Sequence, residues 1–361
     1  MTSFQQIDAS RKADTRSLTR RNLLRGAGAV GLALPLGFVG RRVLAGADAP
    51  LCAAPQLAQA AVQVPKTLTL TWNASAICTA PLPVAIDRGI FAQHGLKVEL
   101  INFGSSTEQL LEGIATGKAD AGIGMALRWL KPLEQGFDVR ITAGTHGGCM
   151  RLLAGQDAGI ADLAGLRGKV VGISDMASPA KNFFSIGLAK RGIDPNKDVQ
   201  WRQFPADLLG LALQKGEVQA IADGDPNIWL IRERDKLVEI ASNLSDEYRN
   251  RVCCVLGVRG SLIRQDRPAA TALTAALLEA ADWTAHHPDA AAAVFAQYST
   301  ASQADLSAML RSHTHHHHPI GDDLKREIAL YADELKLVSV LKPSTDSAKF
   351  SEKVFADVLN S

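Results

Sequence analysis

The sequence predicts an α/β protein that contains two doubly wound, mostly parallel sheets, one in each of two lobes. Short apolar runs of strand length alternate along the chain with longer segments of helical periodicity, as expected for parallel sheets covered by helices. The composition agrees, because 47% of the residues are hydrophobic but only 5% are aromatic. Roughly 300 residues follow the export signal described below, and this length favours two lobes over one.

The first unit begins near Lys66. We expect strands at 68–72, 97–101, 119–124 and 139–143, with helices at 83–94 and 109–116. Gly95 occupies a C-terminal capping position after the first of these helices. The hydroxyl side chains of Ser105, Ser106 and Thr107 are available to cap the start of the second.

A second unit of the same plan begins near Leu152. We expect strands at 169–173, 199–203, 220–223 and 237–240, and helices at 180–191 and 206–215. The chain then returns through 251–258, and the remainder reads as helices at 267–286, 288–297, 302–311 and 322–335. This order predicts that lobe 1 comprises 66–150 and 256–361, and that lobe 2 is an insert comprising 151–255.

Residues 1–60 are interpreted as a twin-arginine signal peptide. Arg20-Arg21 precedes a Gly- and Ala-rich apolar run at 26–39, which is shorter than the roughly 20 residues that a membrane-spanning helix needs. The small-x-small site that ends at Ala60 is the expected cleavage point. We therefore expect export by the twin-arginine translocase to the periplasm. The residues before Cys52 do not form a lipoprotein motif, so we expect no lipidation.

The charge balance argues against nucleic acid as a partner. Residues 1–60 hold eight of the 39 Lys and Arg residues and three of the 37 Asp and Glu residues. The remaining chain has 31 basic and 34 acidic residues, so the net positive charge of the full sequence comes from the predicted signal peptide. No basic patch indicates nucleic-acid binding. No later stretch reads as long and apolar enough to cross a membrane.

Four motif-bearing stretches follow one another in a fixed order. Residues 83–99 match A-x-x-x-G-x-F-x-x-x-G-L-x-V. Residues 110–122 are similar to L-x-x-G-x-x-D-x-G, residues 160–172 are similar to I-x-D-L-K-G-K-x-V-G, and residues 211–220 form the fourth stretch. In this order they resemble the nitrate/sulfonate/taurine-type substrate-binding proteins of ABC importers. The resemblance covers roughly residues 66–298.

The resemblance implies a type 2 periplasmic-binding-protein fold, in which two crossover strands hinge the lobes and a cleft between them holds the ligand. The expected function is a non-enzymatic periplasmic receptor that closes around a small organic molecule or an oxyanion of the sulfonate/nitrate class. The expected partners are that ligand, an ABC permease with its ATPase and, during export, the twin-arginine translocase. We expect a monomer that binds no nucleic acid and no cofactor, apart from the metal ion considered below.

Carried onto matching positions, the resemblance places ligand-binding residues after the strands of both lobes. They are Asn73, Ser75, Ser105, Ser106, Thr107 and Met125 in lobe 1, and Asp175, Ser178 and Asp225 in lobe 2. Hydroxyl groups at helix starts suit an anionic head group, although the same residues also serve as helix caps. The two aspartates argue against an anion, because no arginine is placed by the sequence to neutralise them. The ligand class therefore stays open between anionic, cationic and polyhydroxyl molecules.

Cysteine and histidine residues suggest a possible second site at the crossovers. His146 and Cys149 lie where the first crossover enters lobe 2, and Cys253-Cys254 lie on the return. A disulfide, a soft-metal site built on His146 and Cys149, and buried free thiols are all compatible with this pattern. The run 315–318, four consecutive histidines, joins two helices and is read as a solvated loop with weak metal affinity.

Two other functions remain as alternatives. Some desulfinases and a pyrimidine synthase share the fold, and Cys78 lies near the cysteine that the desulfinases use after their first strand. The other alternative is a metal-binding periplasmic protein that uses the cysteines and the histidine of the crossovers.

Overall fold

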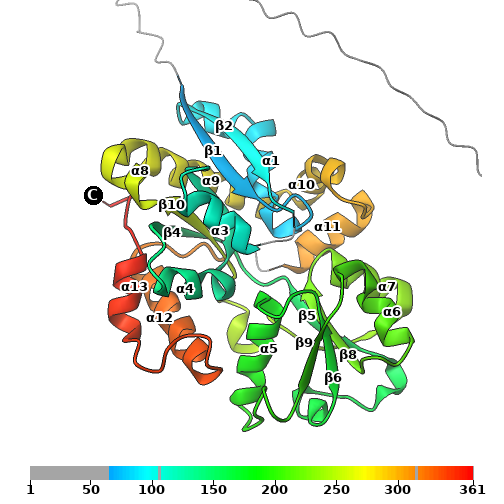
Figure 1. Ribbon diagram of the computed structural model, residues 1–361. Coiled ribbons are helices and arrows are strands. Elements are labelled where there is room, and N and C mark those ends of the chain that lie inside the picture. The colour runs from blue at the N-terminus through cyan, green and yellow to red at the C-terminus, as the bar shows by residue number, and fades with distance from the viewer. Residues whose placement is uncertain (1–64, 105–106, 314–315, 361) are drawn as a thin grey trace, which may run out of the picture. The chain divides into compact units, whose positions relative to one another are not determined.

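The computed structural model describes residues 65–104, 107–313 and 316–360, and the predicted signal peptide lies outside these ranges. Figure 1 shows that the strands of this part form two sheets. The first sheet contains β1 Lys66–Trp72, β2 Leu96–Asn102, β3 Ala121–Met125, β4 Val139–His146 and β10 Cys254–Arg259. The second contains β5 Met150–Ala154, β6 Val170–Ile173, β7 Gln200–Gln203, β8 Ala220–Gly224 and β9 Val238–Ser242.

The two sheets share one topology. Their strand orders are β2-β1-β3-β10-β4 and β7-β6-β8-β5-β9. β1 pairs parallel with β2 and β3, and β6 pairs parallel with β7 and β8. The fourth strand in each order is antiparallel to both neighbours, and it is the strand that joins the sheet directly after a crossover. The predicted α/β class is confirmed, with this antiparallel strand as a refinement.

Helices cover the sheets. They are α1 Pro81–Asp87, α2 Ile90–Gln93, α3 Thr107–Ala115, α4 Ala126–Glu134, α5 Pro179–Ala189, α6 Leu209–Gln214, α7 Asn227–Asp235, α8 Gly260–Gln265, α9 Arg267–His286, α10 Pro288–Phe295, α11 Gln303–Ser312, α12 Gly321–Leu337 and α13 Ser347–Val354. The expected helix at 83–94 is in fact two helices. They break at Gly89, whose φ of 67° is a left-handed conformation that glycine adopts without strain.

Five described elements were missed by the sequence analysis: the helices α8 and α13, and three elements whose local sequence argues against them. α4 contains Pro132, which usually argues against a helix interior. α7 shows almost no amphipathic pattern and has charged residues on several faces. β5 is buried along its whole length but carries Arg151, a residue type that rarely occupies a central strand. In each case tertiary contacts override the local preference of the sequence.

A tryptophan fills a slot made by two glycines in the first sheet. Trp129 of α4 is completely buried, and its ring lies against Gly124 on β3 and Gly257 on β10. A Cβ on Gly124 would stand 2.1 Å from a ring carbon of Trp129, and one on Gly257 would stand 2.7 Å from another. The absence of side chains at both positions therefore allows α4 to pack directly on the sheet.

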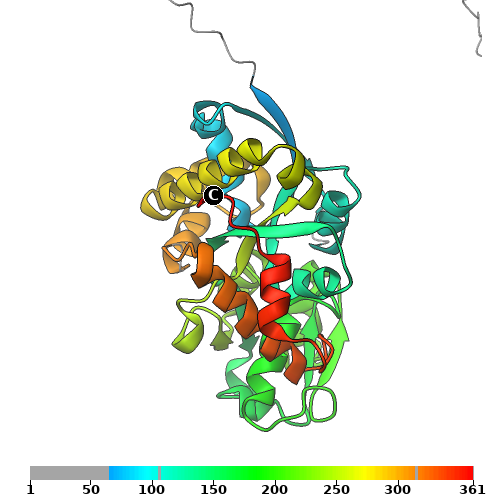
Figure 2. The same cartoon turned by 90° about the vertical axis from the view of Figure 1, so that its left-hand side faces the viewer.

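The C-terminal helices contact segments from both sheets. α12 packs against α4 and β4 and also against α5, and Figures 1 and 2 show it beside α13 at the red end of the chain. Three α12 side chains contact the return crossover. The Glu327 carboxylate accepts the Val252 N–H at 2.6 Å, Tyr331 donates to the Val252 carbonyl at 2.7 Å, and Glu334 pairs with Arg251 at 3.2 Å. None of the described helices is long and apolar enough to cross a membrane.

Candidate functional site

The carboxyl ends of strands from the two sheets meet next to the crossovers. The methyl carbon of Met125, at the end of β3, lies 3.6 Å from where a Cβ on Gly224, at the end of β8, would stand. The following residue, Asp225, donates its N–H to the Cys149 carbonyl of the first crossover at 2.9 Å. Ligands of open α/β sheets bind beyond such strand ends. We therefore take this junction as the candidate site.

On the first-sheet side, the turn after β1 presents polar groups. The Asn73 side chain accepts hydrogen bonds from the Ser75 N–H at 3.0 Å and from its hydroxyl at 2.7 Å, and Ser75 is exposed. Asn102, at the end of β2, accepts the N–H groups of Ala74 and Gly104. Asn102 was missed by the sequence analysis, although its place after a strand is the same signal that singled out Asn73. Asn73, Ser75 and Met125 thus belong to neighbouring strand ends.

Two of the predicted residues lie outside the described part of the chain. These are Ser105 and Ser106, and only the backbone of Thr107 is described, at the start of α3. Their role in ligand binding stays a prediction.

On the second-sheet side, Asp175 and Ser178 both precede α5. Ser178 is buried, and its hydroxyl accepts the Lys181 N–H at 3.1 Å, which makes it the N-cap of α5. Asp175 pairs with Arg128 of α4 at 3.3 Å, and Arg128 also donates to the Ala177 carbonyl at 2.6 Å. Arg128 therefore connects α4 to the loop that precedes α5.

Asp225 lies at the centre of a fully buried polar network. Arg151 on β5 donates to both of its carboxylate oxygens, at 3.1 Å each. His313, directly after α11, contacts the same carboxylate at 2.7 Å through Nε2, and its Nδ1 lies 3.1 Å from His146 Nε2. The side chains of Asp225 and His313 have no exposed surface. The network thus joins the first crossover, β5, the end of β8 and the end of α11.

The network also explains the charge of Asp225. Burial alone would raise the pKa of this carboxyl, but the hydrogen bond with His313 and the charge of Arg151 outweigh it and hold the pKa below its usual range. Asp225 and Asp175 therefore each have an arginine partner, which sequence reasoning did not find. Arg151 lies on a strand and Arg128 on a helix that were both missed, so no sequence signal pointed to them.

The four described cysteines lie together beside this network. Hydrogen bonding with Cys149 lowers the pKa values of the Cys78 and Cys253 thiols, and hydrogen bonding with Cys253 raises that of Cys149. Cys254 contacts the same thiols, and His146 influences Cys78 electrostatically. No three His, Cys, Asp or Glu side chains in the described ranges are arranged to hold a metal ion. A metal site on His146 and Cys149 stays a prediction.

The described part of the histidine run packs onto neighbouring helices. His316 contacts the ring of His286 at the end of α9, with 5.2 Å between centroids, and His317 lies 2.5 Å from the Glu327 carboxylate of α12. His318 is half-buried, and Pro319 accepts the Gly144 N–H of β4 at 2.9 Å. The segment is therefore anchored to α9, α12 and β4 instead of being a fully solvated loop.

A loss of stability in mild acid is predicted from two histidines, the buried His146 and the half-buried His318. Burial lowers the pKa of His146 to about 3 and that of His318 to about 4, compared with about 6.5 for an unfolded histidine. Between these values the unfolded chain binds protons that the folded chain does not. The free energy of unfolding is thus undiminished above pH 6.5 and decreases as the pH falls below it, by about 1.4 kcal/mol per pH unit for each histidine.

Urea unfolding between pH 7.5 and 5 measures this slope. His318→Gln is expected to reduce this slope by the contribution of one histidine, about 1.4 kcal/mol per pH unit. A free energy of unfolding that does not change across this range would contradict the burial of neutral imidazoles.

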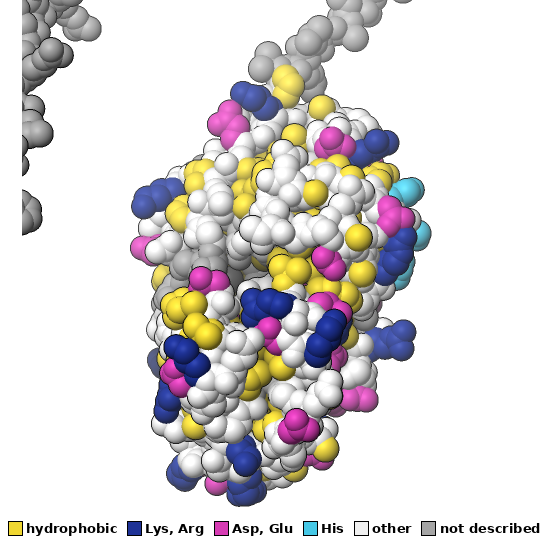
Figure 3. All heavy atoms as spheres, turned by 90° about the vertical axis from the view of Figure 1, so that its right-hand side faces the viewer, with side chains coloured by type: hydrophobic (Ala, Val, Ile, Leu, Met, Phe, Trp, Pro, Cys, Tyr) yellow, Lys and Arg dark blue, Asp and Glu magenta, His cyan; other side chains and the backbone are white. Residues whose placement is uncertain are grey.

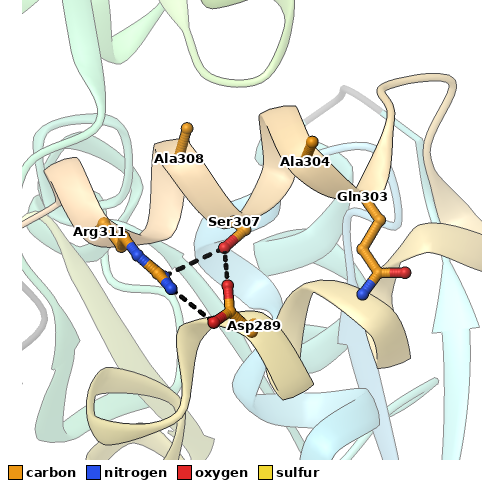
Figure 4. A pocket seen from close by; sticks show the side chains of 6 residues that line it. All are labelled: Asp289, Gln303, Ala304, Ser307, Ala308 and Arg311. Carbon is orange, nitrogen blue, oxygen red and sulfur yellow. Dashed lines mark hydrogen bonds and ion pairs between the residues drawn. The ribbon is translucent and has the colours of Figure 1, made fainter.

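Two surface depressions are found in the described part of the chain. One, of about 540 Å³, is lined by residues of α10 and α11, where Asp289 pairs with Arg311 and Ser307 (Figure 4). The other, of about 490 Å³, is lined by residues of 168–169, 176 and 196–201. Figure 3 shows that charged side chains of both signs are scattered over one face. Asp289, Ser307 and Arg311 hold each other in an exposed ion pair, so we assign this depression to helix packing.

Comparison with known proteins places this geometry in context. The bicarbonate transport ATP-binding protein CmpC of Synechococcus elongatus is 28% identical over 223 residues, which make up 56% of this chain and 33% of that protein. The chain thus spans about a third of the length of the curated relatives it matches.

Solved structures show the same fold at low identity. The periplasmic aliphatic sulphonate-binding protein SsuA of Escherichia coli has a TM-score of 0.68 at 16% identity, over 81% of this chain and 93% of that one. The periplasmic nitrate-binding protein NrtA of Synechocystis PCC 6803 has a TM-score of 0.67 at 16% identity, over 82% and 87%. The desulfurization enzyme DSZB has a TM-score of 0.59 at 16% identity, over 82% and 98%. The type 2 periplasmic-binding-protein fold is therefore confirmed.

A family model described as NMT1-like matches residues 63–299, which include every described strand and both crossovers. This match covers well over half of the sequence, so the chain belongs to the NMT1-like family.

Proposed function

We propose that the chain is the periplasmic solute-binding receptor of an ABC importer, and that it binds a small organic molecule or an oxyanion at the junction of the two sheets. The observation that carries the proposal is the meeting of strand ends from both sheets, Met125 against Gly224, beside two crossover segments. A ligand at this junction contacts both lobes only when the two lobes have closed on it. Its binding energy therefore shifts the population towards a closed form.

The relatives support a transport role and not an ATPase role. CmpC and NrtC are named as ATP-binding transport proteins, but a nucleotide-binding P-loop requires Gly-Lys followed by Ser or Thr. The two Gly-Lys steps in this chain, at 117–118 and 168–169, are followed by Ala119 and Val170. We therefore assign the shared segment to solute binding, with the permease and its ATPase as separate partners. Export through the twin-arginine pathway to the periplasm, without lipidation, is part of the proposal.

The arginine partners of Asp175 and Asp225 bear on the ligand class. Because Arg128 and Arg151 neutralise these carboxylates, they no longer argue against an anion. The side-chain NH2 group of Asn73 and the hydroxyl of Ser178 at the start of α5 offer uncharged donors, which suit nitrate, bicarbonate or a sulfonate without a full counter-charge. This favours the oxyanion class over a cation.

A larger side chain at Gly224 tests the proposed site. Gly224→Leu extends a side chain beyond the Cβ position, which already lies 3.6 Å from the Met125 methyl carbon and 3.9 Å from the Cys149 carbonyl oxygen, and is therefore expected to oppose closure. Calorimetric titration with nitrate, bicarbonate, ethanesulfonate and taurine should identify a ligand that binds with 1:1 stoichiometry. We expect its affinity to fall at least about tenfold in Gly224→Leu.

Gly155→Ala is the matched control, because a Cβ at Gly155 has no neighbour within 4 Å. It should bind as the wild type does. Equal affinity in Gly224→Leu and the wild type would place the ligand elsewhere.

One observation favours a second candidate, catalysis by Cys78. Its thiol has a lowered pKa, mainly through hydrogen bonding with Cys149 and Cys254, and His146 lowers it further by its electrostatic influence. Against this, Cys78 is only 2% exposed. Turnover of a sulfinate that is lost in Cys78→Ala would establish the enzyme; the absence of turnover would leave the receptor.

A further inference from the structure

The structure gathers four thiols from three separate segments of the chain. Cys78 follows β1, Cys149 lies in the first crossover, and Cys253 and Cys254 lie in the return crossover and at the start of β10. All four are free thiols, and each is at most 5% exposed. In this thiol cluster, Cys149 and Cys254 each interact with the other three thiols. Neither ligand binding nor the polar network explains this convergence.

The two crossovers that carry Cys149 and Cys253 are fixed against each other. The Cys253 N–H donates to the His146 carbonyl at 2.9 Å. Met150, next to Cys149, exchanges hydrogen bonds with Asn243 at 2.7 and 3.2 Å, and the Asn243 side chain also contacts the Cys253 thiol. Cys253 lies in the loop that precedes β10, so the strict alternation of side chains along a strand does not apply to Cys253 and Cys254. Cys253 and Cys254 therefore both reach Cys149, which strict alternation would not allow.

We propose that Cys149 and Cys253 form a covalent modification site, a disulfide that ties the first crossover to the return crossover. The co-reactant is an oxidant of the disulfide class, and oxidised glutathione serves as the probe for it. This inference does not depend on the identity of the transported solute.

The reaction proceeds by two exchange steps. The Cys253 thiolate attacks one sulfur of oxidised glutathione, which forms a mixed disulfide and releases one glutathione thiolate. The Cys149 thiol then loses its proton and attacks the Cys253 sulfur, which releases the second glutathione. The protein gives up two electrons and two protons, and one oxidised glutathione becomes two reduced molecules. Cys253 is suited to the attacking role because it is the most exposed of the four thiols, at 5%, and because hydrogen bonding with Cys149 lowers its pKa.

Tryptic peptides distinguish the possible pairs. Cleavage after Arg140 and Arg151 isolates Cys149 in 141–151, cleavage after Arg251 and Arg259 isolates Cys253 and Cys254 in 252–259, and Cys78 falls in 67–88. Protein isolated from a bacterial periplasm, or treated with oxidised glutathione, is denatured in iodoacetamide and digested without reduction. We expect peptide 141–151 linked to 252–259, two hydrogens lighter than the sum of the two free peptides.

Variants separate the two vicinal cysteines. The linked peptide should persist in Cys254→Ala and in Cys78→Ala, and disappear in Cys253→Ala. Mapping in the wild type shows without any variant whether 141–151 is linked to 252–259, and fragment ions of the linked peptide then distinguish Cys253 from Cys254, so a folding defect cannot hide the result. Four alkylated thiols after oxidation, a bridge confined to 252–259, or a bridge from 67–88 to 141–151 would each overturn the proposal. None of these outcomes bears on solute binding, which the titration tests separately.

Discussion

Asp225→Asn is expected to lower the free energy of unfolding by about 3 kcal/mol, since breaking a buried ion pair leaves the partner charge uncompensated. Arg151 has an almost fully buried side chain, and Asp225 accepts three of its hydrogen bonds. After the substitution Arg151 would keep Glu239 at 2.6 Å as its only carboxylate partner among the described contacts, and His313 would lose its own. Urea unfolding at pH 7.5 measures the loss.

The matched control for Asp225 is Asp289→Asn. Asp289 also pairs with an arginine, Arg311, but this pair lies at the protein surface on α10 and α11. Surface ion pairs contribute little, so no measurable change in the urea midpoint is expected. If the two variants unfold at the same urea concentration, the network around Asp225 does not hold the crossovers and β8 together as described.

Gly124→Ala is the second substitution with a large expected effect. The added Cβ would stand 2.1 to 2.7 Å from three ring atoms of Trp129, and Gly257 closes the slot on the other side. Because Trp129 is completely buried, its ring cannot move away without disturbing the core. We expect a loss of about 3 kcal/mol in the free energy of unfolding, at the upper end for overpacked cores.

A second substitution in the slot separates overpacking from other causes. Trp129→Leu removes the ring and destabilises the protein by itself, but Gly124→Ala should cost much less in this background. Such a non-additive double-mutant cycle is the signature of direct contact. Gly155→Ala, with nothing near its Cβ, is expected to change the stability by less than about 0.5 kcal/mol. Additive effects of the two substitutions would show that Trp129 is not what Gly124 accommodates.

The sequence predicts the fold well because its signals are local and repeated. Alternating apolar runs and capping residues locate most strands and helices to within a few residues. The elements that escaped prediction, such as α4 and β5, carry Arg128 and Arg151. Their charges are compensated by Asp175 and Asp225, which lie far away in the sequence. A pairing of this kind is invisible until the tertiary fold is known.

The candidate site is less predictable for the same reason. Asn73, Met125 and Asp225 were predicted as ligand-binding residues because each stands at the end of a strand or directly after one, and this placement is a local property. The contact of His313 with Asp225 depends on how α11 packs, and the sequence shows His313 only as the neighbour of a histidine run. The convergence of Cys78 with the crossover cysteines likewise depends on the topology that brings these segments together.

Native mass spectrometry of untagged protein isolated from the periplasm tests the receptor role most directly. The account predicts one small molecule bound per chain, retained in Asp289→Asn and lost in Gly224→Leu. A chain that carries no small molecule, and that gains none when nitrate, bicarbonate or a sulfonate is added at millimolar concentration, would contradict it.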